Sequence, residues 1–282
     1  MSTVPFQYVH HLVTVPVLVE GTEATLVLDS GIGLTLISSS LAAAVGCELT
    51  GATYSGRRMS GQQVTIPLGS VGSLTVGDHR DESPVVGVFD IAGLDGVDGF
   101  LALDYFRLAP LTVDYQARVI VLEDADSMAA RAGAAIAVDV RVEQDAHSIA
   151  VFLPLDVLGR ASLWVEVDMG SDSLILNAAL ADELGINLND ATTRRVDGRD
   201  ETGHEYSRYF TQFQGVVNVT GASSIGQRDP EVMFQDIIYD GLVGDAFLRN
   251  FTVTYDLPNA RMVFAQQEGL PTVARGMRFS KR

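Results

Sequence analysis

The chain has 282 residues, of which 47% are hydrophobic and 20% are charged, and its formal net charge is −17. The hydrophobic content excludes a disordered chain, and the length is enough for one large domain or for two of ordinary size, each with its own core. The negative charge argues against nucleic acid and anionic membrane surfaces as partners, because their phosphates would be repelled.

The cysteine and histidine content and the apolar runs of the chain indicate which cofactors and which cellular location to expect. Cys47 is the only cysteine and the five histidines are scattered, so no intrachain disulfide and no cysteine-based metal cluster is expected. No N-terminal stretch has the pattern of a secretion signal, and no apolar run approaches the ~18 residues of a membrane helix. We therefore expect a cytoplasmic monomer that uses no metal and no cofactor and does not bind a membrane.

In chain order, the first half consists mostly of short β-branched segments bounded by glycine or turn residues, which is typical of strands. One short helix is expected at 37–46, closed by Gly46, and a further helical turn at 104–109. The predicted strands are residues 12–21, 24–29, 63–77, 84–91 and 111–122.

The second half repeats the first. Residues 26–46 align without a gap on residues 165–185, a separation of 168 − 29 = 139 that places Asp29 on Asp168. Residues 98–115 align on residues 240–257 with a separation of 240 − 98 = 142. Because the two separations differ by only three residues, the chain contains a duplicated unit.

The duplication defines the expected organisation. Acidic and alanine-rich residues at 123–135 interrupt the strand pattern, so we divide the chain into halves at 1–130 and 131–282. The second half is expected to carry its own short helices at 177–185 and 244–251. Each half is thus mostly β, with one or two small helices.

One aspartate after an apolar strand is usually a turn residue or a helix N-cap. Here both copies also keep a glycine two positions later, which makes positive φ available for a sharp turn. The later segments 99–102 and 241–244 could pack as buried strands behind these loops. If the halves pair about a pseudo-twofold axis, the two carboxyl groups meet and share one proton. One of them then acts as a base on water while the other donates to a carbonyl oxygen.

The segment LVLDSG, followed by LTLIS and later by DGFLALDYF, resembles the motifs of the aspartic protease superfamily, pepsin-like and retropepsin-like. The resemblance covers both halves and implies a single chain with two homologous β-barrel-like lobes related by a pseudo-twofold axis. It also implies an aspartic endopeptidase acting on a peptide or protein substrate in the cleft between the lobes. The implied catalytic residues are Asp29 and Asp168, with support from Ser30, Gly31, Gly170 and Ser171.

The same resemblance implies a hairpin flap over the site, for which residues 54–66 are the candidate. Residues 194–205 are interpreted as a solvated loop or as the corresponding flap of the second half.

The chain departs from the family pattern at two places. Met169 lacks the hydroxyl that the family has after the acid, where Ser30 does have it, and Ser171 could supply one from a different position. Ala102 stands where the later motif expects glycine, whereas Gly244 fits.

Three functions therefore remain open. The first is an active endopeptidase with Asp29 and Asp168 as its catalytic pair. The second, favoured by Met169, is a catalytically weak or inactive relative that binds peptides in the cleft. The third is a carbohydrate hydrolase with paired acids, for which the sequence offers only the two carboxylates. Peptide hydrolysis that disappears when either aspartate is replaced would separate the first function from the second.

Overall fold

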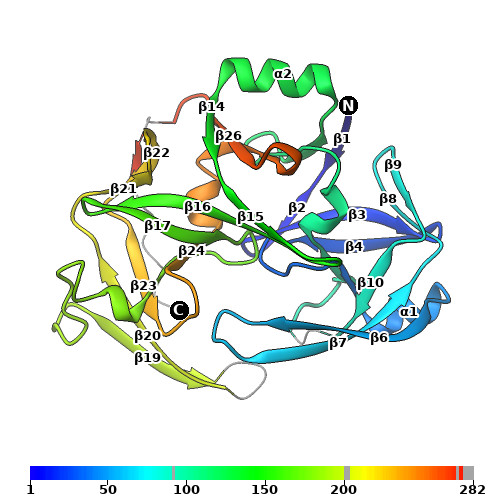
Figure 1. Cartoon of the computed structure of the whole chain (residues 1–282), viewed down its shortest axis with the longest axis horizontal. Coiled ribbons are helices and arrows are strands. Elements are labelled where there is room, and N and C mark those ends of the chain that lie inside the picture. The colour runs from blue at the N-terminus through cyan, green and yellow to red at the C-terminus, as the bar shows by residue number, and fades with distance from the viewer. Residues whose placement is uncertain (91–92, 200–203, 271–272, 276–282) are drawn as a thin grey trace.

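The protein is mainly β and has two lobes, as expected. The computed structural model describes residues 1–90, 93–199, 204–270 and 273–275. In this part of the chain the strands form sheets of six, ten and eleven strands. Figure 1 shows the first half on the right and the second on the left, with a layer shared by both halves above them.

The six-stranded sheet joins the two lobes. Three of its strands come from each half, and β12 pairs with β25 at the middle, with Leu111 opposite Tyr255. Because this pairing is between backbones of both halves, the lobes share one continuous hydrogen-bonded sheet. Its order is β1 (Ser2–Pro5), β13 (Val119–Leu122), β12 (Leu111–Asp114), β25 (Phe251–Asp256), β26 (Arg261–Gln266) and β14 (Ile136–Asp139).

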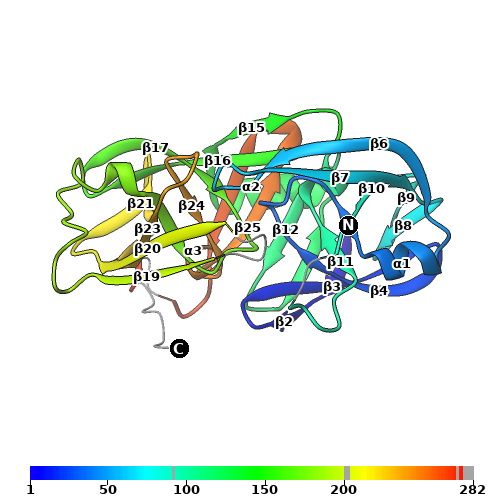
Figure 2. The ribbon, with the colours of Figure 1, turned by 90° about the horizontal axis from the view of Figure 1, so that it is seen from below.

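The ten-stranded sheet forms the first lobe, with strands of two to ten residues. In order along the sheet its strands are β6 (Glu48–Arg57), β7 (Gln63–Ser70), β10 (Val85–Val88), β5 (Leu36–Ile37), β11 (Gly99–Leu101), β4 (Thr22–Leu28), β3 (Leu12–Val19), β8 (Ser73–Val76) and β9 (His79–Glu82), with β2 (Gln7–Val9) beside β3. Figure 2 shows the long β6–β7 hairpin running along one side of this lobe toward the other.

The eleven-stranded sheet forms the second lobe and repeats the same plan. Its order is β19 (Arg194–Arg199), β20 (Glu205–Gln212), β23 (Glu231–Gln235), β18 (Leu174–Asn177), β24 (Gly241–Val243), β17 (Arg160–Val167), β16 (Ile149–Val157), β21 (Val216–Val219), β22 (Ala222–Arg228) and β27 (Val273–Arg275), with β15 (Arg141–Gln144) beside β16. The parallel pair β4–β11 of the first lobe corresponds to β17–β24 of the second.

The helices are few and short. They are α1 (Ser39–Ala44), α2 (Ala125–Ala134) and α3 (Asp245–Leu248), with 3-10 turns η1 (Leu103–Phe106), η2 (Ala178–Leu180) and η3 (Leu257–Asn259). The predicted helices at 37–46, 104–109 and 244–251 are confirmed as short elements, and Gly46 follows α1 at φ 69°. The expected helix at 177–185 is only the η2 turn followed by turns.

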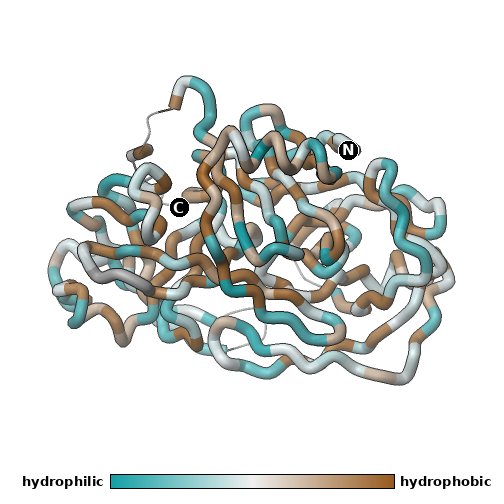
Figure 3. The backbone as a smooth tube through the Cα atoms, turned by 45° about the horizontal axis from the view of Figure 1, so that its top comes forward, coloured by the Kyte–Doolittle hydropathy of each residue, from teal (hydrophilic) through white to brown (hydrophobic). Residues whose placement is uncertain are grey.

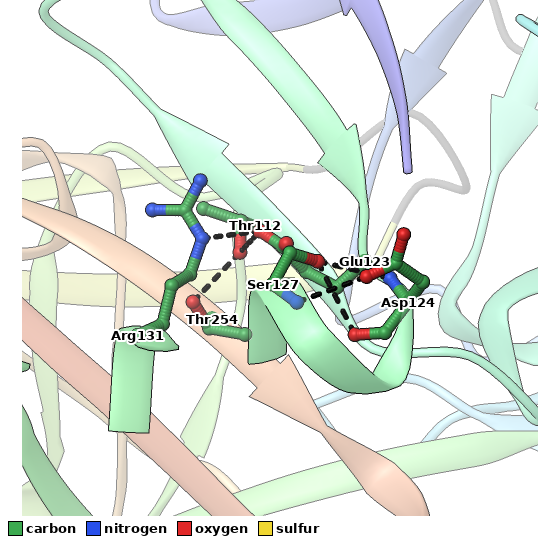
Figure 4. Close-up of polar contacts among 6 residues, drawn as sticks. All are labelled: Thr112, Glu123, Asp124, Ser127, Arg131 and Thr254. Carbon is green, nitrogen blue, oxygen red and sulfur yellow. Dashed lines mark hydrogen bonds and ion pairs between the residues drawn. The ribbon is translucent and has the colours of Figure 1, made fainter. Parts of the chain in front are cut away.

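Helix α2 is not among the predicted elements, and its start is stabilised by a side-chain network (Figure 4). Asp124 and Ser127 form a reciprocal capping box, which fixes the first turn. Buried Glu123 accepts a hydrogen bond from Thr112 Oγ1 at 2.6 Å and is ion-paired with Arg131. The hydroxyl oxygens of Thr112 and Thr254 are hydrogen-bonded at 2.7 Å, so this network spans β12 and β25. The boundary expected between residues 130 and 131 falls inside this helix.

The core follows the strands. Apolar segments run through the middle of the chain trace and hydrophilic segments lie at its periphery (Figure 3). One large cluster of buried side chains contains residues of both halves, such as Val15, Leu26, Val165 and Val253. Two smaller clusters lie apart from it, one in each half: around Val27 and Leu36 in the first and around Ile175 and Leu242 in the second.

Candidate active site

The two repeated aspartates meet between the lobes. Asp29 follows β4 and its N–H donates to the Leu101 carbonyl of β11 at 3.0 Å. Asp168 follows β17 and its N–H donates to the Val243 carbonyl of β24, also at 3.0 Å. The segments behind the loops are therefore buried strands, as the sequence predicted, and they hold both loops in the same way.

Glycine lets the loops come together. A Cβ on Gly31 would lie 2.6 Å from Asp168 Cγ, and a Cβ on Gly170 would lie 2.8 Å from Asp29 Cγ. Neither glycine adopts a positive φ, so the conformational reason expected from the sequence is wrong. The requirement is close approach: each glycine leaves room for the carboxyl group of the opposite loop.

Hydrogen bonds inside each loop fix the carboxyl groups. The Gly31 N–H donates to Asp29 Oδ1 at 2.8 Å, and the Gly170 N–H donates to Asp168 Oδ1 at 2.9 Å. His11, just before β3, adds a contact between halves, because its Nε2 donates to the Gly170 carbonyl at 3.0 Å. No sequence pattern indicates that this histidine lies at the site.

Ser30 and Met169 secure the loops differently. The Ser30 hydroxyl donates to the Val167 carbonyl at 2.6 Å and accepts from the Met169 N–H at 3.0 Å, so it reaches into the opposite loop. Met169 is 1% exposed and packs in the large core cluster. Ser171 does not replace the missing hydroxyl, because its Oγ accepts from Ser173 N–H, and no bond from it to the first half is formed in the described residues.

The departure at Ala102 is also explained in part. The Ala102 N–H donates to Thr35 Oγ1 at 3.2 Å, and Thr35 Oγ1 donates to the Asp104 carboxylate at 2.5 Å. At the equivalent place in the second half, a Cβ on Gly244 would lie 2.8 Å from the Ser173 carbonyl oxygen. In the second half, only glycine fits at this position, because a side chain would collide with the backbone of residues 171 and 173. In the first half, alanine fits, and its N–H is bonded to the Thr35 hydroxyl.

Both aspartates are hard to ionise. Burial raises the pKa of Asp29, against hydrogen bonds from backbone N–H groups that lower it. Burial also raises the pKa of Asp168, and the negative charge of Asp29 adds to this effect. Since two adjacent carboxyl groups in a buried site cannot both ionise at low cost, the pair retains a proton to a higher pH than isolated aspartates would.

The pair lies in a cavity of about 1600 Å³ that is lined from both lobes. Side chains of both aspartates, of the β6–β7 hairpin and of the cleft face of the second lobe line it. A cavity of this size accepts a segment of polypeptide as well as a small molecule. Three lining residues that the sequence did not single out are Glu166, Tyr239 and Ile238.

The predicted flap is confirmed as a hairpin. Strands β6 and β7 pair with Tyr54 opposite Ile66, and the turn between them places Gly61 at φ 81°, where glycine is favoured. The hairpin tip contacts the second lobe: Met59 accepts a hydrogen bond from the Ile238 N–H at 2.9 Å and packs on the apolar cluster of that lobe. The flap is therefore closed over the cavity.

Residues 194–199 form β19, which pairs with β20 from Arg194 opposite Phe210 to Arg199 opposite Glu205. The part of the predicted segment 194–205 at 200–203 lies outside the described residues. Arg194 lies over the Phe210 ring, and both line the cavity. The exposed side chains of β19 fit the interpretation as a solvated segment, and its pairing with β20 fits the interpretation as a flap.

Among the described residues, no group of three or more acidic, histidine or cysteine side chains could hold a metal ion. No helix in that same part of the chain is long and apolar enough to span a membrane.

Comparisons with known proteins agree with this geometry. Residues 15–105 match a family model described as aspartyl protease. No curated protein sequence matches the chain.

Solved structures share its fold over nearly the whole length. An aspartic proteinase from Irpex lacteus is 15% identical, with 94% of this chain and 97% of that one covered and a TM-score of 0.54. Conglutin gamma, a basic 7S globulin from lupine seeds, is 10% identical with 94% and 95% covered and a TM-score of 0.53. Basic 7S globulin from soybean is 11% identical with 99% of each chain covered and a TM-score of 0.54.

The fold and the family match define the class of protein. Residues 15–105 thus match the aspartyl protease family, and the whole chain has the two-lobed, mainly β fold of a pepsin-like aspartic proteinase. The similar structures carry the names of a proteinase and of seed globulins, so the fold by itself does not decide the activity.

Proposed function

We propose that the chain is an aspartic endopeptidase in which Asp29 and Asp168 activate water. The observation that carries this proposal is that each aspartate carboxyl group lies against the glycine of the opposite loop and interacts with the other aspartate, in a cavity lined from both lobes. A pair that holds one proton contains both groups the reaction needs, a carboxylate base and a carboxylic acid.

The proposed reaction follows from this protonation state. The ionised carboxylate removes a proton from a water molecule, whose oxygen attacks the peptide carbonyl carbon, while the protonated carboxyl group donates to the carbonyl oxygen. The tetrahedral intermediate collapses when the first carboxyl group passes the proton it took from water to the peptide nitrogen and the C–N bond breaks, while one hydroxyl of the intermediate returns a proton to the second carboxylate. The N–H groups of Gly31 and Gly170 hold the carboxyl groups in position throughout.

The test is cleavage of an unfolded protein by the parent and by Asp29→Asn and Asp168→Asn. Each variant removes an ionisable oxygen but preserves the shape of the side chain, so we expect folded proteins whose cleavage rate is reduced by at least about a thousandfold. The matched control is Asp182→Asn, which removes an exposed carboxylate of the second half that does not line the cavity. Cleavage by Asp29→Asn at the parent rate would place the activity elsewhere.

The second candidate function is a peptide-binding protein with little or no catalysis. Buried Met169 favours it, because one of the two hydrogen-bonding hydroxyls between the loops is replaced by apolar packing. The two seed globulins of the same fold also support it as an alternative. In that case the parent would bind peptides in the cleft but would not cleave them at any pH between 3 and 8 at which it is folded, a range of about five units around the titration of carboxyl groups.

A further inference from the structure

A third carboxyl group lies beside the two aspartates. Glu166 is on β17, two residues before Asp168, so successive alternation along the strand places both side chains on the same face. The flanking residues Val165 and Val167 are 0% exposed and belong to the large core cluster. Glu166 is 6% exposed and lines the cavity. It is therefore a buried acid directed into the cleft.

The residue equivalent to Glu166 in the first half is a valine that serves only packing. The 139-residue repeat places Glu166 on Val27, and the neighbouring parallel strands agree, since Val27 pairs with Phe100 and Glu166 pairs with Leu242. Val27 is 0% exposed in an apolar cluster. A valine thus satisfies the packing of this strand position, and packing does not explain the glutamate.

The carboxyl group of Glu166 has no partner. No hydrogen bond or ion pair to it is formed by any residue that the structure describes. Arg141, on β15 opposite Phe152, is ion-paired to Glu143 at 3.1 Å and lies over the Phe152 ring. An unpaired buried polar group costs free energy, so its retention in a cavity wall points to a ligand that supplies the partner.

The charges that act on Glu166 are negative, although Arg57, Arg58, Arg194 and Arg208 line other parts of the cavity. Burial raises the pKa of Glu166 well above its ordinary value, and the charges of Asp168, Asp29 and Glu143 raise it further. Glu143 lies at the rim of the same cavity, with its side chain 58% exposed. At the part of the wall around Glu166, the neighbouring carboxyl groups therefore favour a cation over an anion.

We propose that Glu166 is a specificity-determining residue that binds a lysine or arginine side chain of the bound peptide. The inference rests on the proposed function in one respect, that the cleft binds a peptide. Glu166 lies two residues from Asp168, about 7 Å along the strand, so the cationic side chain belongs to a residue within about two positions of the bond over the aspartates. A bound ammonium or guanidinium group supplies the missing hydrogen bonds and the compensating charge together.

The experiment measures binding, so that it does not depend on turnover. Peptides carry a central statine, a non-cleavable hydroxyl-bearing unit, and have lysine, glutamine or norleucine at each of the two positions on either side of it. Norleucine reproduces the aliphatic part of lysine without its charge. Fluorescence anisotropy then gives the dissociation constants for the parent, for Glu166→Gln, for Glu166→Val and for the exposed-acid control Asp182→Asn.

We expect the parent to bind the lysine peptide roughly ten- to a hundredfold more tightly than the norleucine peptide at one position, as for a hydrogen bond to a charged group. Glu166→Gln should lose this preference, and Glu166→Val, which restores the residue of the first half, should reverse it. Asp182→Asn should keep it. Equal binding of lysine and norleucine peptides by the parent at every position, tighter binding of the glutamine peptide than of the lysine peptide, or failure of all the peptides to bind would each overturn the inference.

The same peptides without statine separate this inference from the proposed function. Cleavage by the parent with no preference for lysine would leave the endopeptidase proposal intact and would contradict the role of Glu166. Selective binding of the lysine peptide without any cleavage would support the role of Glu166 and would contradict the endopeptidase proposal.

Discussion

At the scale of single residues, the two loops that carry Asp29 and Asp168 are joined asymmetrically. Ser30 reaches across with its hydroxyl, bonding both the Val167 carbonyl and the Met169 N–H, while Met169 contributes a buried apolar side chain. A hydrogen bond between buried groups fixes direction as well as distance, whereas apolar packing fixes mainly distance. The loop of Asp168 is thus held to the first half by the two hydrogen bonds of Ser30 and the one from His11, and the Met169 side chain adds no directional contact in return.

Met169→Thr should add this directional contact. By the repeat, the residue equivalent to Val167 is Leu28, so the introduced hydroxyl would donate to the Leu28 carbonyl. We expect turnover about two- to tenfold above that of the matched variant Met169→Val, which has the same shape without the hydroxyl. Both variants should unfold more easily than the parent by about 2–5 kcal/mol, because each leaves a cavity at a residue that is 1% exposed.

The readout is turnover measured well below the melting temperature, together with the affinity for a statine peptide. Equal turnover of folded Met169→Thr and Met169→Val would mean that the absent hydroxyl does not limit the enzyme. A gain in stability without a gain in turnover would assign the contact to folding alone.

Residue-level features differ in how far the sequence predicts them. The duplication is enough to find Asp29 and Asp168, because an identical pattern at two places is improbable by chance. The same alignment contains the signal for Glu166, a glutamate opposite Val27 in a buried strand, but a charged residue in a strand is usually solvent-facing. Only the three-dimensional arrangement shows that its face of the sheet is the cavity wall.

At the scale of elements, the β6–β7 hairpin is the part of the fold that controls access to the site. Its tip is attached to the second lobe by the hydrogen bond from Ile238 to Met59 and by the contact of Met59 with an apolar cluster that includes Ile175 and Met233. Local opening of a hairpin tip costs much less free energy than global unfolding. Release of this attachment would widen the access of a peptide to the cavity.

Met59→Ala should therefore shift the flap toward the open state. The substitution removes most of the apolar surface that the tip buries, which is worth about 1.5 kcal/mol and so about tenfold in the opening equilibrium. Hydrogen exchange of the backbone amides at residues 57–63 should become faster by that factor. The control is Leu49→Ala in the same hairpin, a side chain that is 65% exposed and does not line the cavity.

The outcome distinguishes two ways of holding the tip. Faster exchange in Met59→Ala alone assigns the attachment to the side-chain contact. Exchange that is equal in Met59→Ala and Leu49→Ala would show that the backbone hydrogen bond to Ile238 is sufficient, and the expected role of Met59 would then be wrong.

Short elements are the least predictable part of the fold. Residues 123–135 interrupt the strand pattern and so indicate a boundary, yet they contain helix α2, whose alanines and capping box favour a helix. The segment 177–185 contains similar residues but forms only η2, with Asn177 Oδ1 accepting from the Ala179 N–H. Helices of this length depend on tertiary packing more than on propensity, so the sequence pattern does not decide them.

At the scale of the whole molecule, the six-stranded sheet makes one body of the two halves. Its central pairing between β12 and β25 joins residues more than a hundred positions apart, and no local pattern in the sequence specifies such a pairing. Thr112 and Thr254 add a side-chain hydrogen bond at the same place. The position of the aspartates relative to one another is therefore set by the shared sheet as well as by the loops themselves.

The buried carboxyl groups also determine how the stability of the whole protein depends on pH. In addition to the aspartate pair and Glu166, burial raises the pKa of Asp104 to about 6, against hydrogen bonds from Thr35 and Tyr105. A carboxyl group whose pKa is higher in the folded state binds more protons there than in the unfolded chain. The free energy of unfolding then decreases as the pH rises between the unfolded and folded pKa values.

For Asp104 this interval runs from 3.8 to about 6, and it corresponds to a loss of about 3 kcal/mol. We therefore expect the free energy of unfolding of the parent to fall between pH 4 and pH 6, and to fall less steeply in Asp104→Asn, which cannot titrate. The exposed carboxylates with lowered pKa values, such as Asp90 and Asp190, act in the opposite direction, but solvent screens them.

Urea unfolding at half-unit steps of pH measures the slopes, with Asp182→Asn as the exposed control whose slope should match the parent. Parallel curves for the parent and Asp104→Asn would mean that Asp104 ionises as readily in the folded protein as in the unfolded chain. The pH dependence would then have to come from the carboxyl groups of the cleft.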